Sequence, residues 1–96
     1  MHSTLDDKKI LRRSDRVDET RIGDRFVLYH RDTGSGVVLN PSGSAIWDSL
    51  SVPKSTGQLI EEVAGRHPNS PRDRIADDVA AYVSALREQL LVDERL

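Results

Sequence analysis

The sequence contains no cysteine, and this absence excludes disulfide bonds, thiolate nucleophiles and cysteine-based zinc sites. Aromatic residues make up only 4% and hydrophobic residues 36% of the 96-residue chain, so we expect one domain with a small core. A chain of this length is too short for a dinucleotide-binding fold. No apolar run is long enough to cross a membrane, and the first residues lack the apolar stretch of a signal peptide, so a cytoplasmic location is expected.

Residues 1–16 are polar and charged, and their few large apolar side chains share no common face. Such a segment cannot bury enough apolar surface to offset the entropy lost on ordering. We therefore predict a mobile charged tail over residues 1–16 and a single domain over residues 17–96. One hypothesis is that this chain is a structural subunit of a larger synthetase. The charged tail would then dock it to that synthetase.

The first half of the predicted domain has the pattern of β-strands. Residues 26–29 are a β-prone run, residues 32–36 are rich in turn-forming residues, and residues 37–39 are a second apolar run. Together they predict a hairpin, and residues 17–22 supply a candidate further strand. The expected sheet has two or three antiparallel strands, and a sheet this small leaves edges open.

After Asn40 the pattern is helical. Asn40 is a predicted N-cap with Pro41 at the first helical position, residues 55–58 form a capping box, and residues 70–73 combine a cap, a proline and an acid. The apolar residues of the third helix recur at steps of three and four, as Ile75, Val79, Tyr82, Val83, Leu86 and Leu90. The expected fold class is therefore α+β, with the small sheet followed by three helices, as in a winged helix.

Candidate catalytic groups are few. Asp32, Thr33 and Gly34 form the triplet of aspartic proteases, but a hairpin turn explains it more simply in a chain whose second half is helical. The three histidines lack carboxylates at metal-ligand spacing and are expected at the surface. Ser42 and Ser44 have no activating base nearby in the sequence. We find no catalytic constellation and expect no enzyme activity.

A winged helix also raises the question of DNA binding. The chain has a net charge of −2, and its third helix carries three arginines against four acids, namely Arg72, Arg74 and Arg87 against Asp73, Asp77, Asp78 and Glu88. A recognition helix needs a basic exposed face to neutralise phosphates. DNA binding is therefore kept only as the alternative hypothesis. We expect neither nucleic acid nor a membrane as the partner.

About three quarters of the chain, from Gly23 to Val92, resembles the PqqD family. The resemblance is carried in order by Phe26-Val27-Leu28-Tyr29, Asp32-Thr33-Gly34, Leu39-Asn40-x-x-Gly43-x-x-Ile46-Trp47, Leu59-Ile60 with Val63, Arg66-His67-Pro68, Asp78-Val79, Leu86 and Leu90-Leu91-Val92. The chain departs from the family at Gln89, where glycine is frequent, and at residues 51–53, where an aspartate-glycine turn is common. Both departures fall at expected helix ends.

The resemblance implies a RiPP recognition element, a winged-helix-like domain that binds the leader segment of a ribosomally made precursor peptide. Such domains act as peptide chaperones and present the leader to a modifying enzyme. That enzyme is a radical S-adenosylmethionine protein in pyrroloquinoline quinone (PQQ) synthesis, and a leader peptidase works beside a similar domain in lasso-peptide pathways. The family is not catalytic and has no iron–sulfur cluster, so no cofactor is expected.

In this family the leader adds as a strand along the last hairpin strand and over the third helix. Strand addition suits a disordered peptide, because backbone hydrogen bonds set the register and side-chain pockets give specificity. Carried onto this sequence, the expected peptide-binding residues are Val37, Val38, Leu39, Arg74, Asp78, Ala81, Tyr82 and Ala85.

Two points stay open. The opposite shoulder of the third helix, with Ala76, Ala80 and Arg87, is the alternative wall of the peptide site. An open edge and the connector at residues 51–54 also leave a strand- or helix-exchanged homodimer open. Trp47, the only tryptophan, is expected in the core.

Overall fold

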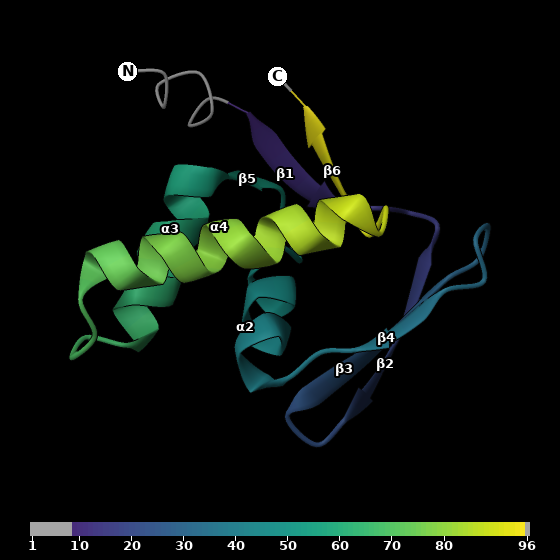
Figure 1. Cartoon of the computed structure of the whole chain (residues 1–96), viewed down its shortest axis with the longest axis horizontal. Helices are drawn as coiled ribbons and strands as arrows, with labels where there is room; N and C mark the ends of the chain where they lie inside the picture. Colours follow the sequence, from purple (N-terminus) through teal and green to yellow (C-terminus); the bar gives the residue numbers. More distant parts are fainter. Residues whose placement is uncertain (1–8, 96) are drawn as a thin grey trace.

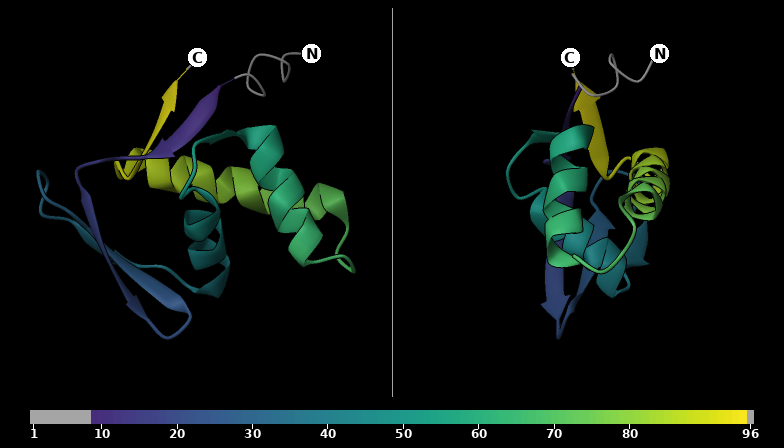
Figure 2. Two further views of the ribbon diagram at one scale, coloured as in Figure 1. Left: turned by 180° about the vertical axis from the view of Figure 1, so that it is seen from behind. Right: turned by 90° about the vertical axis from the view of Figure 1, so that its left-hand side faces the viewer.

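The computed structural model describes residues 9–95. The elements follow one another as β1 (Ile10–Arg13), β2 (Val17–Ile22), β3 (Arg25–His30), β4 (Gly36–Val38), α2 (Pro41–Ser49), β5 (Lys54–Ser55), α3 (Thr56–Arg66), α4 (Arg72–Glu88) and β6 (Val92–Arg95). They form two antiparallel three-stranded sheets, in the orders β5-β1-β6 and β2-β3-β4, around three helices. The predicted α+β class is confirmed, and Figures 1 and 2 show the β2-β3-β4 sheet projecting as a wing away from β1 and β6.

The first sheet was not expected. Within the segment predicted as a mobile tail, Ile10–Arg13 form β1, which pairs with β5 and β6, and Leu11 is fully buried. The tail prediction is therefore wrong for this strand, because partners from the far end of the chain satisfy its backbone. The prediction that everything after Asn40 is helical is wrong for β5 and β6. Residues 1–8 of the predicted tail lie outside the described residues.

The helix ends follow local signals. Asn40 caps α2 by accepting a hydrogen bond from the Gly43 N–H at 2.8 Å, and Ser55 and Gln58 form the predicted capping box of α3. The start of α4 differs from the prediction, because Pro71 occupies the N-cap position and no side chain caps the helix. At the other end of α4, Leu90 has a φ of +62°. The Leu91 N–H then bonds the Leu86 carbonyl at 2.9 Å, which turns the chain into β6.

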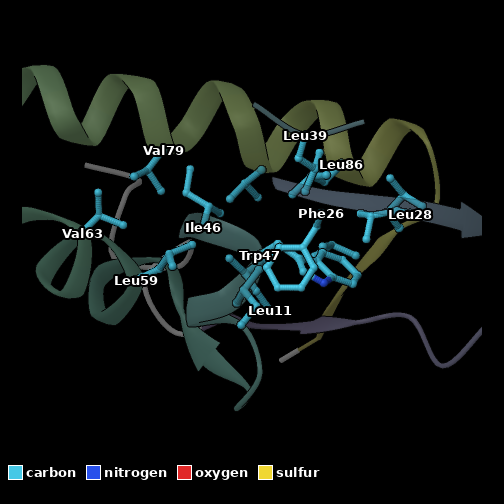
Figure 3. Packing of buried hydrophobic residues seen from close by; sticks show 14 of the residues in the cluster. Leu11, Phe26, Leu28, Leu39, Ile46, Trp47, Leu59, Val63, Val79 and Leu86 are labelled. Atoms are coloured by element: carbon cyan, nitrogen blue, oxygen red, sulfur yellow. The ribbon is translucent and has the colours of Figure 1, made fainter. Parts of the chain in front are cut away.

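The core lies between the helices and both sheets. Fifteen of the residues from 9 to 95 are buried hydrophobic residues of this core, and in Figure 3 the cluster runs from Val63 and Leu59 at one end to Leu28 at the other, with α4 along one side. Trp47 is 1% exposed, so its predicted core position is confirmed. Its indole Nε1–H donates a hydrogen bond to Glu19 at 2.8 Å, and the Arg13 guanidinium stacks over its ring at 4.6 Å. These contacts join β1, β2 and α2.

Candidate peptide-binding edge of the wing sheet

The predicted hairpin is confirmed as β3 and β4, with β4 at the edge of the wing sheet. The Leu39 N–H donates to the Phe26 carbonyl at 2.8 Å, and the His30 N–H donates to the Ser35 carbonyl at 2.9 Å. Because hydrogen-bonded and non-hydrogen-bonded pairs alternate in an antiparallel ladder, the N–H and C=O groups of Val38 and Gly36 point away from β3. No described strand pairs with this side of β4. The wing therefore ends in an open backbone edge.

The side chains of β4 and the residue after it point to two different faces. Val37 is half-buried against the core and Leu39 is buried, whereas Val38 is 60% exposed on the outer face. The junction with α2 is closed by Ser44, whose hydroxyl accepts from the Phe26 N–H at 2.9 Å and donates to the Leu39 carbonyl at 3.3 Å. The end of the edge strand is thus fixed to the first turn of α2.

Tyr82 joins α4 to this junction. Its ring is half-buried and packs against the core, and its hydroxyl donates to the side-chain carbonyl of Asn40, the cap of α2. Tyr82 is among the residues expected to bind the peptide, and the structure brings it next to Asn40, the residue that follows Leu39. The hydroxyl therefore has a protein partner, and the ring forms the corner where β4, α2 and α4 meet.

The other predicted residues of α4 are spread around the helix. Asp78 and Arg74 lie on the same side as Tyr82, and both line a hollow between α2, α3 and α4. Ala85 is exposed. Ala81 lies almost opposite the buried stripe at 100° per residue, so the structure does not bring it to β4.

The alternative shoulder of α4 faces elsewhere. Arg87 forms an ion pair with Glu94 of β6 at 3.2 Å, and this side of the helix packs toward the β5-β1-β6 sheet. Ala80 is exposed and Ala76 is half-buried. The wall next to the wing edge is therefore the shoulder that carries Tyr82.

The hollow itself was not anticipated. It has a volume of about 650 Å³, and besides the α4 residues it is lined by Pro41, Ala45, Arg66 and His67. The sequence offered no signal for it, because no spacing rule links the C-terminal end of α3 to the start of α2. His67 does lie at the end of α3, as expected.

We expect Gly43→Ala to damage the Tyr82 corner. A Cβ at Gly43 would lie 2.7 Å from Cε1 of Tyr82, so the ring must move. Overpacking of this kind costs about 1–3 kcal/mol of unfolding free energy, measured by chemical denaturation. In a Tyr82→Ala background the clash is gone, and the same substitution becomes neutral or stabilising because alanine favours helix.

Gly65→Ala in α3 is the matched control, because a Cβ there meets nothing within 4 Å. It should stabilise the protein in both backgrounds. An equal cost of Gly43→Ala with and without the tyrosine ring would contradict the contact.

The Asp32-Thr33-Gly34 triplet forms the tight turn between β3 and β4. Arg16 donates hydrogen bonds to both carboxylate oxygens of Asp32, at 2.9 Å and 2.6 Å. The N–H groups of Asp32 and Thr33 donate to Nδ1 of His30, which is 4% exposed, so the expectation of a surface histidine is wrong here. The interpretation of the triplet as a hairpin turn, rather than as part of a protease site, is confirmed.

The Arg16–Asp32 pair predicts a dependence of stability on acid pH. The hydrogen bonds from Arg16 lower the pKa of Asp32 below its ordinary value of 3.8. A carboxyl with a lowered folded-state pKa contributes stability above its unfolded pKa and loses that contribution as the pH falls through the folded pKa. Asp32→Asn should therefore be less stable than wild type near neutral pH, and the difference should shrink below about pH 4.

The measurement is urea unfolding of both proteins between pH 7 and pH 2. Asp24→Asn, in the turn between β2 and β3, serves as the control. Its free energy of unfolding should change with pH in the same way as that of wild type. A gap between wild type and Asp32→Asn that stays constant down to pH 2 would show that the pair contributes nothing.

The described residues contain no group of three histidine, cysteine, aspartate or glutamate side chains that could hold a metal ion. Within residues 9–95, no helix is long and apolar enough to cross a membrane.

Comparison with known proteins agrees with this geometry. The family model of coenzyme PQQ synthesis protein D (PqqD) matches residues 25–92. The solved structure of TbiB1 in complex with the TbiA(beta) leader peptide is similar to this chain with a TM-score of 0.79 and 27% sequence identity, and the match covers 85% of this chain and 94% of that chain. No curated protein shows a significant match. The resemblance seen in the sequence is confirmed, and since the family model spans more than half of its length, this chain belongs to the PqqD family.

Proposed function

We propose that this protein is a non-catalytic chaperone that binds the leader segment of a ribosomally made precursor peptide. The observation that carries the proposal is the open edge of β4 beside α4, in a chain whose structural relative TbiB1 was solved with a leader peptide bound. A disordered leader supplies the backbone hydrogen-bond partners that this edge lacks. The main-chain hydrogen bonds that it forms offset the conformational entropy that it loses on binding.

In the proposed complex the leader adds antiparallel to β4 and becomes the fourth strand of the wing sheet. The outward N–H and C=O groups of Val38 and Gly36 provide its hydrogen bonds. Alternate leader side chains then point toward α4, over Leu39 and the Tyr82 corner. The pairing sets the register, and the helix shoulder selects the side chains.

The bound leader is held for a second protein, the modifying enzyme. A radical S-adenosylmethionine protein, or a leader peptidase as in lasso-peptide pathways, is the kind of partner that family membership supports. Precursor peptides are made in the cytoplasm, so we place the protein there.

DNA binding has no support from the charges on α4. Arg72 is paired with Glu61 and Arg87 with Glu94, which leaves Arg74 as the arginine of this helix without an ion pair among residues 9–95. A face with four acids and one such arginine does not attract phosphate.

The test is a titration of isotope-labelled protein with synthetic leader segments of short precursor peptides, the TbiA(beta) leader among them, followed by amide chemical shifts. Strand addition predicts shifts at residues 36–39 and around Tyr82. Light scattering in the same samples reports whether the edge is occupied by a second copy of the chain instead. Shifts absent from residues 36–39 would overturn strand addition, and a self-paired dimer that does not dissociate on peptide addition would overturn the proposed function.

A further inference from the structure

The hollow between α2, α3 and α4 begins where the edge strand ends. Pro41 and Ser42, the first two residues of α2, line it, and they follow β4 with only Leu39 and Asn40 between. Tyr82 lines the same hollow and is hydrogen-bonded to Asn40. A peptide that lies along β4 and runs past Leu39 therefore reaches this hollow without leaving the surface.

The bottom of the hollow is apolar. Ile46, Ile75 and Val79 line it, and each is at most 6% exposed. Ala45, with its small side chain, lies among them. A volume of about 650 Å³ has room for a large apolar side chain together with the backbone that carries it.

The rim of the hollow is positively charged, in contrast to the chain as a whole. Arg66 and Arg74 line it together with one carboxylate, that of Asp78, which lies one helical turn after Arg74 on α4. Arg74 has no ion pair among residues 9–95, and the hydrogen bond that Arg66 makes is a long one of 3.4 Å to the Ala45 carbonyl. By contrast, Arg72, two residues before Arg74, is already paired with Glu61.

We propose that this hollow takes an apolar side chain from the upstream part of the leader, and that Arg66 and Arg74 bind a carboxylate next to it. The inference rests on the proposed function and adds to it the chemistry of a second contact region. Guanidinium groups bind carboxylates with paired hydrogen bonds, and the N-terminus of α2 adds partial positive charge on the same side.

The register predicts where these leader residues lie. In an antiparallel complex, the leader residue opposite Val38 points its side chain to the outer face, as Val38 does. The residue before it faces α4 beside Leu39. The next helix-facing residue is two positions further upstream, and it passes Pro41 at the entrance to the hollow. The predicted motif is thus an apolar residue near this position with an aspartate or glutamate beside it.

The probe is a dye-labelled leader peptide from the titration described above, and the readout is fluorescence anisotropy. Arg66→Gln and Arg74→Gln should each weaken binding by about three- to tenfold, whereas Asp78→Asn should strengthen it. Arg72→Gln is the matched control on the same helix and should bind like wild type. Replacing the upstream leader carboxylates by amides should remove the difference between Arg74→Gln and wild type.

The apolar part is tested by filling the hollow. Ala45→Leu should weaken binding by about tenfold without removing a charge, and Ala80→Leu, on the other side of α4, should not. When leader peptide is added to the Ala45→Leu variant, the amide signals of residues 36–39 must still shift. Such shifts show that the leader still pairs with the edge strand. Circular dichroism checks that both variants are folded.

The outcomes separate the two levels of the proposal. Shifts at residues 36–39 together with wild-type affinity for Arg66→Gln, Arg74→Gln and Ala45→Leu would overturn the second contact and leave strand addition standing. A leader that binds but has no carboxylate upstream of its strand segment, or a gain in affinity for Arg74→Gln, would also overturn it. Loss of binding to every form of the protein overturns the proposed function itself.

Discussion

Val38→Pro is expected to weaken leader binding by about 10- to 100-fold while the protein remains folded. The substitution removes the outward N–H of the edge strand and leaves one leader carbonyl without its donor. It also places a pyrrolidine ring where the leader backbone must approach. The fold survives because this N–H makes no bond to β3, and proline is tolerated on edge strands.

Val38→Thr is the matched control, since threonine keeps both the N–H and the branched side chain. It should bind the leader close to wild-type affinity in the same anisotropy titration. Thermal unfolding of both variants checks the fold. If Val38→Pro binds as tightly as Val38→Thr, the leader does not use the backbone of β4, and the peptide site lies elsewhere.

Leu11→Ala is expected to lower the free energy of unfolding by about 2–5 kcal/mol, a large part of the roughly 5–15 kcal/mol available to a small domain. Leu11 is fully buried in the middle of β1, which joins β5 to β6. The deletion leaves a cavity in the core beneath the first sheet. Urea denaturation with a fixed m-value measures the loss.

Val52→Ala provides the comparison, because Val52 is 62% exposed in the connector before β5. It should change stability by less than about 0.5 kcal/mol. An effect of Leu11→Ala as small as that of Val52→Ala would mean that β1 contributes nothing to the folded state. The prediction of a mobile tail would then hold for this strand.

Local signals in the sequence predicted the wing and the helices. The β3–β4 hairpin follows from two apolar runs around a turn-rich segment, and the caps at Asn40 and Ser55 follow from side chains that reach backbone N–H groups three residues away. These interactions are made within a few residues, so the sequence contains all of their partners. The same applies to the buried stripe of α4 from Ile75 to Leu86. The prediction is wrong for Leu90, which lies beyond the end of the helix and is 56% exposed.

The first sheet could not be predicted in this way. The strand Ile10–Arg13 has only two apolar residues, and it is held by Val92–Arg95 from the opposite end of the chain. Two such short segments are unstable alone, because each lacks the hydrogen-bond partners that the other supplies. Nor could helical spacing say which shoulder of α4 lies beside β4, since that depends on how the helix is packed.

By itself, then, the sequence determined the absence of thiol chemistry, the α+β class, the edge strand with its neighbouring helix, and the family to which the chain belongs. Tertiary structure alone decided that β1 closes the core with β6, that Tyr82 donates a hydrogen bond to the cap of α2, and that Arg66 and Arg74 line the same hollow. The physical reason is the range of the interactions. Caps and turns are satisfied locally, whereas sheet edges, corners and pockets exist only after residues from distant parts of the chain have packed together.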